Sequence, residues 1–177
     1  MYRVVWFCYA LFLLQFSRVD AAGAILKNVQ ADQIDYDTRK IRLAGAVWIL
    51  HEFGEIRCEK GVLLFEETQT AKLAPRRILL EGSVQVTLQD GSTISSDEAD
   101  IDCASLEAVF VSKSPAKVVY ITRVVDDKVS VPVKATSQAL RVLMKKSEGS
   151  KSEYVLADLQ GEGAVRVEYQ HVESEKE

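Results

Sequence analysis

The chain of 177 residues contains only two histidines, His51 and His171. Neither has a serine or cysteine partner in a motif for nucleophilic catalysis. The stretch GEGAVR lacks the third glycine of a dinucleotide-binding fingerprint, and no helical pattern follows it. The sequence therefore predicts no catalytic residue, no cofactor and no enzyme activity.

The sequence also offers no convincing metal site, although SDEADID places Asp97, Glu98, Asp100 and Asp102 close together. Calcium loops present such ligands in a tight turn that contains glycine. Here the last three acidic residues share one face of an alternating segment, which favours a solvated strand face. We expect no bound metal.

A basic excess is missing as well, since the formal net charge is −4 and the sequence pI is about 5.4. Binding to the phosphates of nucleic acid requires clustered lysine and arginine. Basic residues adjoin one another only in pairs such as Arg76-Arg77 and Lys145-Lys146, and both of these lie in polar stretches. Nucleic acid is therefore not an expected partner.

The first 21 residues have the layout of a secretory signal peptide. Arg3 precedes the apolar run Val4–Phe16, and Val19 and Ala21 supply small residues for a cleavage site. The run is shorter than the roughly 20 residues of a membrane span, although an uncleaved anchor stays open as an alternative. We expect a signal peptide over 1–21, one domain over 22–170 and a disordered tail over 171–177.

Cysteine is scarce: apart from Cys8 in the first segment, the chain has only Cys58 and Cys103. An oxidising compartment would permit a disulfide between these two. Both cysteines fall on apolar strand faces, so two small buried thiols are an equally good interpretation.

What the sequence has in abundance is alternation with a period of two residues. The motif Gly-x-Val-x-(Ile/Val) occurs as GAVWI at 45–49, GSVQV at 82–86 and GAVRV at 163–167. Within the surrounding segments apolar residues alternate with polar ones, and the glycine lies on the apolar side. This pattern predicts strands with one solvated face that bend or pack closely at the glycine.

A second pattern lies between these motifs, in VQADQIDY (29–36), IRCEKGVL (56–63), ISSDEADI (94–101) and VKATSQAL (133–140). Each segment has a small residue two positions after its first residue, namely Ala31, Cys58, Ser96 and Ala135. The apolar parity then shifts by one residue, which a β-bulge or a strand corner requires. Four such shifts predict strands that bend together into a curved pair of sheets.

Eight segments are expected to form strands: 29–36, 41–49, 56–65, 80–88, 94–103, 109–121, 133–142 and 155–169. No stretch keeps apolar residues at helical spacing without glycine or proline. The predicted fold is all-β, an antiparallel open β-jellyroll built from repeated strand pairs. If its apolar face is filled by its own side chains it is a core, and if it is open it is a trough for lipid.

The motifs, in their order, resemble the OstA-like (LptA) family of periplasmic lipopolysaccharide-transport proteins. The resemblance covers about 28–169, including SKSPAKVVY at 112–120, where Lys113 replaces a family glycine. The matching positions are Ala31-Asp32, Tyr36, Gly45-Val47, Gly82-Val84, Ser96-Asp97 and Gly163-Val165.

The resemblance implies a jellyroll that is open along one side and holds the acyl chains of lipid A between two sheets. It further implies head-to-tail stacking, either as a homo-oligomer or with inner-membrane LptC-like and outer-membrane LptD-like jellyrolls, which would bridge the two membranes. The expected lipid-binding residues of the inward apolar face are Ile34, Tyr36, Val47, Ile49, Leu63, Val84, Val86, Ile101, Val118, Tyr120, Leu140, Val142, Val165 and Val167. A membrane-anchored LptC-like component and a structural β-domain without lipid remain as alternatives.

Overall fold

The computed structural model describes residues 26–66, 74–126, 129–147 and 154–169, and the regular elements in these ranges are all β-strands. In chain order the strands are β1 (Leu26–Gln30), β2 (Gln33–Asp37), β3 (Lys40–His51), β4 (Gly54–Leu64), β5 (Arg77–Leu88), β6 (Thr93–Asp102), β7 (Glu107–Val111), β8 (Val118–Asp126), β9 (Val129–Ser137), β10 (Ala139–Lys146), β11 (Tyr154–Glu162) and β12 (Arg166–Tyr169). The all-β prediction is confirmed. The predicted signal peptide (1–21) and the predicted tail (171–177) lie outside the described residues.

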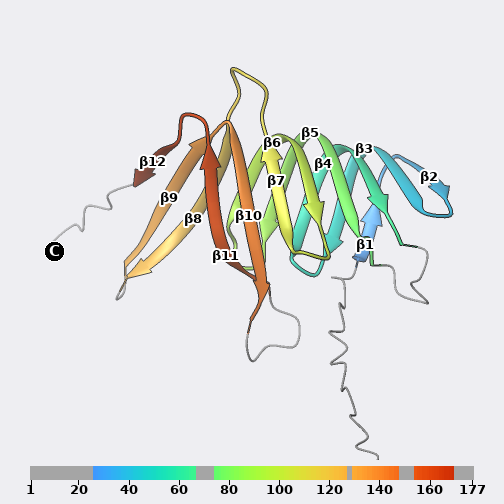
Figure 1. Cartoon of the computed structure of the whole chain (residues 1–177), viewed down its shortest axis with the longest axis horizontal. Coiled ribbons are helices and arrows are strands. Elements are labelled where there is room, and N and C mark those ends of the chain that lie inside the picture. The colour runs from blue at the N-terminus through green and yellow to red at the C-terminus, as the bar shows by residue number, and fades with distance from the viewer. Residues whose placement is uncertain (1–25, 67–73, 127–128, 148–153, 170–177) are drawn as a thin grey trace, which may run out of the picture.

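All strand pairs are antiparallel and belong to one open, 12-stranded sheet (Figure 1). Its main path runs β1-β3-β4-β5-β6-β7-β10-β11, while β2 also pairs with β3. At β6 the sheet divides, because Glu98–Asp102 pair with β7 and Thr93–Ser95 pair with β8. Strands β8, β9 and β12 continue this second branch. Strand β6 therefore belongs to both branches of the sheet.

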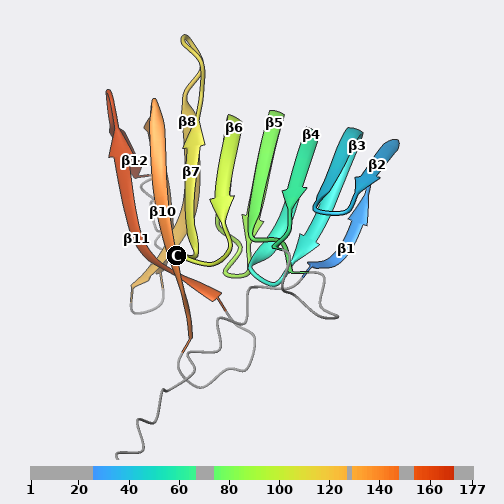
Figure 2. The same cartoon turned by 45° about the vertical axis from the view of Figure 1, so that its right-hand side comes forward.

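The strands fold over into two facing layers, as the open jellyroll prediction requires (Figures 1 and 2). Layer 1 consists of β2, β7, β10 and β11 together with 40–44, 60–64, 77–81 and 98–102. Layer 2 consists of β1, β8, β9 and β12 together with 47–51, 54–57, 84–88 and 93–96. The line of bends that joins the layers is called the spine, and the opposite margin, where the strand tips lie, is called the mouth.

The Gly-x-Val motifs lie at the spine. Register shifts separate Ala44 from Val47 in β3 and Glu81 from Val84 in β5. Gly45 and Gly82 have φ of +70° and +79° in the structure, so the backbone turns in the left-handed region that glycine enters at little steric cost. The strands therefore bend at these glycines, as predicted, and a register shift between Arg57 and Lys60 lies in β4, one of the segments predicted to shift parity.

The eight predicted segments contain twelve strands. Four segments were each predicted as one strand and each contain two: 29–36 is divided at Ala31-Asp32, 109–121 at 112–117, 133–142 at Gln138 and 155–169 at 163–165. In the last segment of the second pattern the strand breaks at Gln138, which lies between Ala135 and Leu140, where the parity was predicted to shift.

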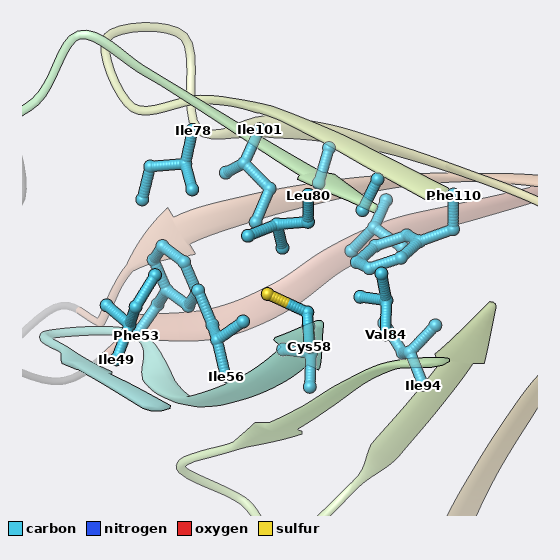
Figure 3. Close-up of a cluster of buried hydrophobic side chains, with 14 of the residues drawn as sticks. Ile49, Phe53, Ile56, Cys58, Ile78, Leu80, Val84, Ile94, Ile101 and Phe110 are labelled. Carbon is cyan, nitrogen blue, oxygen red and sulfur yellow. The ribbon is translucent and has the colours of Figure 1, made fainter. Parts of the chain in front are cut away.

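The hydrophobic core lies between the two layers. Ile49, Ile56, Leu63, Ile78 and Ile94 have no exposed surface. Figure 3 shows that side chains of layer 1 point toward those of layer 2, for example Leu80 toward Cys58. Burial of apolar surface contributes about 25 cal/mol per Å². Because many strands pack their apolar faces together here, this packing between the layers is the main source of stability of the fold.

Candidate functional site

The inward face of the two layers is the candidate site. Of the fourteen residues that the sequence placed on it, ten are buried between the layers: Val47, Ile49, Leu63, Val84, Val86, Ile101, Val118, Tyr120, Leu140 and Val142. They come from β3 to β6, β8 and β10. In this structure the space between the layers is therefore filled by the protein's own side chains, and the residues form a continuous apolar interior.

The other four residues mark the two ends of this interior. Ile34 and Tyr36 on β2 are 54% and 70% exposed, and Val165 and Val167 near β12 are 53% and 48% exposed. Ile34 pairs with the buried Leu43, so it lies on the inward side of layer 1. These side chains are exposed because no further strand follows them at the sheet edge.

Val165 departs from the strand predicted over 155–169. It lies in the bend between β11 and β12 and has no partner in the strand ladder, whereas Val167 pairs with Ala135. The preceding Gly163 has a φ of +84°, as at the other Gly-x-Val bends. The third motif therefore turns the chain from layer 1 to layer 2 and ends the interior at Tyr169, which is 71% exposed.

At the spine, each glycine of a Gly-x-Val motif lies under a longer polar side chain. A Cβ atom added at Gly45 would lie 2.4 Å from Oδ2 of Asp32, and one at Gly82 would lie 2.8 Å from Cβ of Glu59. The backbone N–H of Asp32 donates a hydrogen bond to the carbonyl oxygen of Gly45 at 2.9 Å. The two sequence patterns are therefore complementary, since the bend of one strand leaves room for the bend of the next.

Both described cysteines are free thiols and both are buried, which agrees with their interpretation as two buried thiols; they do not form the disulfide left open by the sequence. Burial raises the pKa of Cys58 to about 11 and that of Cys103 to about 12. Cys58 lies at the bend of β4, where its Sγ contacts the carbonyl oxygen of Lys60 at 3.1 Å. Cys103 follows β6 at the mouth, and its backbone N–H donates to the carbonyl oxygen of Arg76.

Three acidic residues of SDEADID, namely Glu98, Asp100 and Asp102, lie on the outer face of layer 1. Asp100 forms an ion pair with Arg77, and Glu98 forms one with Lys113. Asp102 accepts hydrogen bonds from the backbone N–H groups of Ser105 and Ala104, which lower the pKa of its carboxyl group. Within the described ranges no group of three or more His, Cys, Asp and Glu residues has the arrangement of a metal site.

His51 lies between the strands predicted over 41–49 and 56–65, but it is the last residue of β3 and is 1% exposed. Its ring lies against Phe53, with 4.1 Å between the ring centroids, and Nδ1 accepts a hydrogen bond from the Phe53 backbone at 3.5 Å. His51 therefore packs against Phe53 at the mouth.

Several interior residues have no counterpart in the predicted set. Phe53 lies between two of the predicted strands, in HEFGE, yet it is 2% exposed, and Tyr154 begins β11 with 5% exposure. An isolated aromatic residue between charged residues gives no periodic signal, so the sequence could not show that its side chain returns to the interior. By contrast, Leu80 and Ile56 follow the same alternation as the predicted residues and could have been included.

A cleft of about 830 Å³ lies over the outer face of layer 1. Val62, Leu79 and Val109 line it from neighbouring strands, and Arg42 and Asp100 stand beside them. These residues alternate with the buried ones, so the cleft lies outside the interior predicted to hold lipid.

Comparison with protein-family models and with curated proteins found no match to this chain. In the part of the chain that the structure describes, no helix is long and apolar enough to cross a membrane.

Proposed function

We propose that this protein binds the acyl chains of lipopolysaccharide between its two layers and carries the lipid across the periplasm to the outer membrane. The observation that carries the proposal is the continuous apolar interior, which runs from β2 to β12 and is uncovered at both ends. In an ordinary closed core, large residues such as Tyr36 and Tyr169 would be covered and not exposed to water at its two ends.

The strength of the hydrophobic effect makes such a carrier workable. Burial of an acyl chain contributes about 0.8 kcal/mol per CH₂ group, so a chain of a dozen carbons would gain on the order of 10 kcal/mol. Lipid in the interior would be bound tightly enough to cross water. Because the protein's own side chains fill this interior now, lipid must separate the layers when it binds.

The uncovered ends fit partners that supply the next strand. Edge strands are normally protected against pairing, yet β1 and β2 form one open end and β11 and β12 the other. A further jellyroll, from the LptC-like or LptD-like partners or from a second copy, would extend both layers and continue the interior. Such a head-to-tail contact joins two different surfaces and produces an open chain of subunits.

The lipid proposal is tested with a photo-crosslinking amino acid at Val84, which is 1% exposed and points inward, and at its neighbour Gln85, which is exposed on the outer face. The full-length variants are incubated with lipopolysaccharide micelles, irradiated and analysed by immunoblot. We expect capture at Val84 and none at Gln85. Equal capture at both positions, or no capture at Val84, contradicts the proposal and leaves the structural β-domain as the alternative.

The end-to-end contact is tested with Val167→Asp and Tyr36→Asp, which place a charge on an exposed inward residue at each end. Ile121→Asp is the matched control, because Ile121 is 43% exposed on the outer side of β8. We expect concentration-dependent oligomers of the wild type and the control in sedimentation velocity, and monomers of both end variants with unchanged circular dichroism. A wild type that stays monomeric over a wide concentration range contradicts the contact.

A further inference from the structure

Tyr154 connects the two layers at the mouth. It is the first residue of β11 and pairs with Lys146 of β10, so its backbone belongs to layer 1. Its side chain is 5% exposed and joins the hydrophobic core. In Figure 1 the tip of β10 and the start of β11 lie at the lower edge of the molecule, opposite the line of bends.

The hydrogen-bond partners of Tyr154 belong to layer 2. Its hydroxyl group donates to Oε2 of Glu52 at 3.3 Å, and its backbone N–H donates to Oε1 of Gln89 at 3.1 Å. The amide of Gln89 in turn donates to the carbonyl oxygen of Glu52. Glu52 lies in the turn between β3 and β4 and Gln89 in the turn between β5 and β6, which are strand tips of layer 2.

This arrangement differs in kind from the spine. At the spine the layers are joined by the backbone itself, because β3, β4, β5 and β6 each pass from one layer to the other. At the mouth Tyr154, Glu52 and Gln89 join the layers through side chains, with the buried Phe53 and Met144 nearby in the same core cluster. A few hydrogen bonds can break without loss of the strand ladders, so the mouth is the margin at which the layers can separate locally.

We propose that Tyr154, Glu52 and Gln89 form a clasp that keeps the mouth closed, and that the acyl chains reach the interior sideways through the mouth when this clasp opens. The clasp itself follows from the geometry of the three residues, whereas the route of the lipid rests on the proposed function. The clasp explains how an interior filled by its own side chains gains room, because its release lets layer 1 move away from layer 2 about the spine.

The two native thiols are reporters for this opening. Cys103 lies at the mouth and Cys58 lies at the spine, and both are buried. Opening of the clasp exposes Cys103 first, whereas Cys58 becomes accessible only when the bends themselves unfold. Alkylation by N-ethylmaleimide, followed by mass spectrometry of the peptides, measures each thiol separately in the full chain, including Cys8.

The test compares Tyr154→Phe and Gln89→Ala with Tyr36→Phe, a matched change at an exposed tyrosine of β2, at the opposite end of the sheet from Tyr154. Because each clasp variant removes at least one hydrogen bond that joins the two layers, we expect Cys103 to react at least about fivefold faster in both. Cys58 should react at the wild-type rate, and Tyr36→Phe should change neither rate. An equal increase at both thiols, or no increase at Cys103, overturns the clasp.

The route of the lipid is measured separately, with the crosslinker at Val84 and lipopolysaccharide micelles. Capture by the otherwise unaltered chain tests the proposed function. The thiol-alkylation test of the clasp uses no lipid and does not depend on that result. When Tyr154→Phe is combined with the crosslinker, we expect capture to become several-fold faster. An unchanged rate of capture overturns the sideways route and favours lengthwise passage from the uncovered ends.

Discussion

The middle and the ends of the inward face carry the same kind of residue in different surroundings. Tyr36, Ile41 and Leu63 lie in one row across β2, β3 and β4. Leu63 has no exposed surface, while Tyr36, two strands away at the edge, is 70% exposed. Alternation therefore assigns a residue to a face of the sheet, whereas the burial of its side chain depends on how many strands lie on each side of it.

The largest effect is expected when the side chains of Leu63 and Tyr36 in this row are each truncated to alanine. Leu63→Ala should lower the free energy of unfolding by about 2–5 kcal/mol, because it leaves a cavity in the closed interior. Tyr36→Ala should change it by less than about 0.5 kcal/mol, since its side chain is largely in water. Urea denaturation of the monomeric protein measures both. Similar losses for the two variants would mean that the end is as closed as the middle.

Alanine at the bends should have a smaller effect that again depends on position. Gly82 and Gly163 have φ of +79° and +84°, and an added Cβ would lie 2.8 Å from the Cβ atoms of Glu59 and Gln138, respectively. Gly82→Ala should cost about 2–3 kcal/mol of global stability through backbone strain and this contact. Gly163→Ala should affect only β12, so it should weaken the end-to-end contact and leave the global transition nearly unchanged.

Gly91→Ala is the control for backbone strain alone. Gly91 has a φ of +83°, but an added Cβ would meet no atom within 4 Å. We expect a loss of about 1 kcal/mol in urea denaturation. A loss as large as that of Gly82→Ala would show that the close approach of Glu59 contributes nothing to the bend.

Alkaline pH should weaken the middle specifically. The pKa values of Cys58 and Cys103 are raised by burial above the ordinary value of 9.0, so the folded protein holds these protons while the unfolded chain releases them. Their contribution to stability is complete below about pH 9 and is lost as the pH rises to about 11 for Cys58 and about 12 for Cys103, on the order of 1 kcal/mol per pH unit for each thiol.

This pH effect is measured as a difference between the wild type and the double variant Cys58→Ala/Cys103→Ala. Urea denaturation between pH 8 and pH 11 should show a steeper fall of stability for the wild type, because the other titrating groups are shared. Parallel curves would mean that the two thiols are hydrated in the folded protein.

The smallest effects are expected on the outer face, where middle and end should not differ. Arg42–Asp35 lies at the N-terminal end and Arg77–Asp100 in the middle, and the side chains of both pairs are 37–62% exposed. Arg42→Ala and Arg77→Ala should each cost less than about 1 kcal/mol in thermal denaturation, and less still at high salt. A large loss of thermal stability for Arg77→Ala alone would show that the middle and the end differ on the outer face as well.

Periodicity predicted the inward face and the bends, because a period of two residues with a one-residue shift has few physical solutions for an all-β chain. It did not separate the two strands within each of four predicted segments. Val47, Val84 and Ile101 were assigned to the inward face from parity alone, and all three are buried. Glycine marked the bends in β3 and β5 because only glycine reaches φ near +70° to +80° without strain.

Which inward residues are enclosed, and which contacts close the mouth, depend on how the folded layers face each other. Val86 and Val167 follow the same motif, yet Val86 is 1% exposed and Val167 is 48% exposed. The contacts of Tyr154 with Glu52 and Gln89 join residues that are 102 and 65 positions apart. No local pattern encodes such a contact, because it exists only when the folded layers bring their strand tips together.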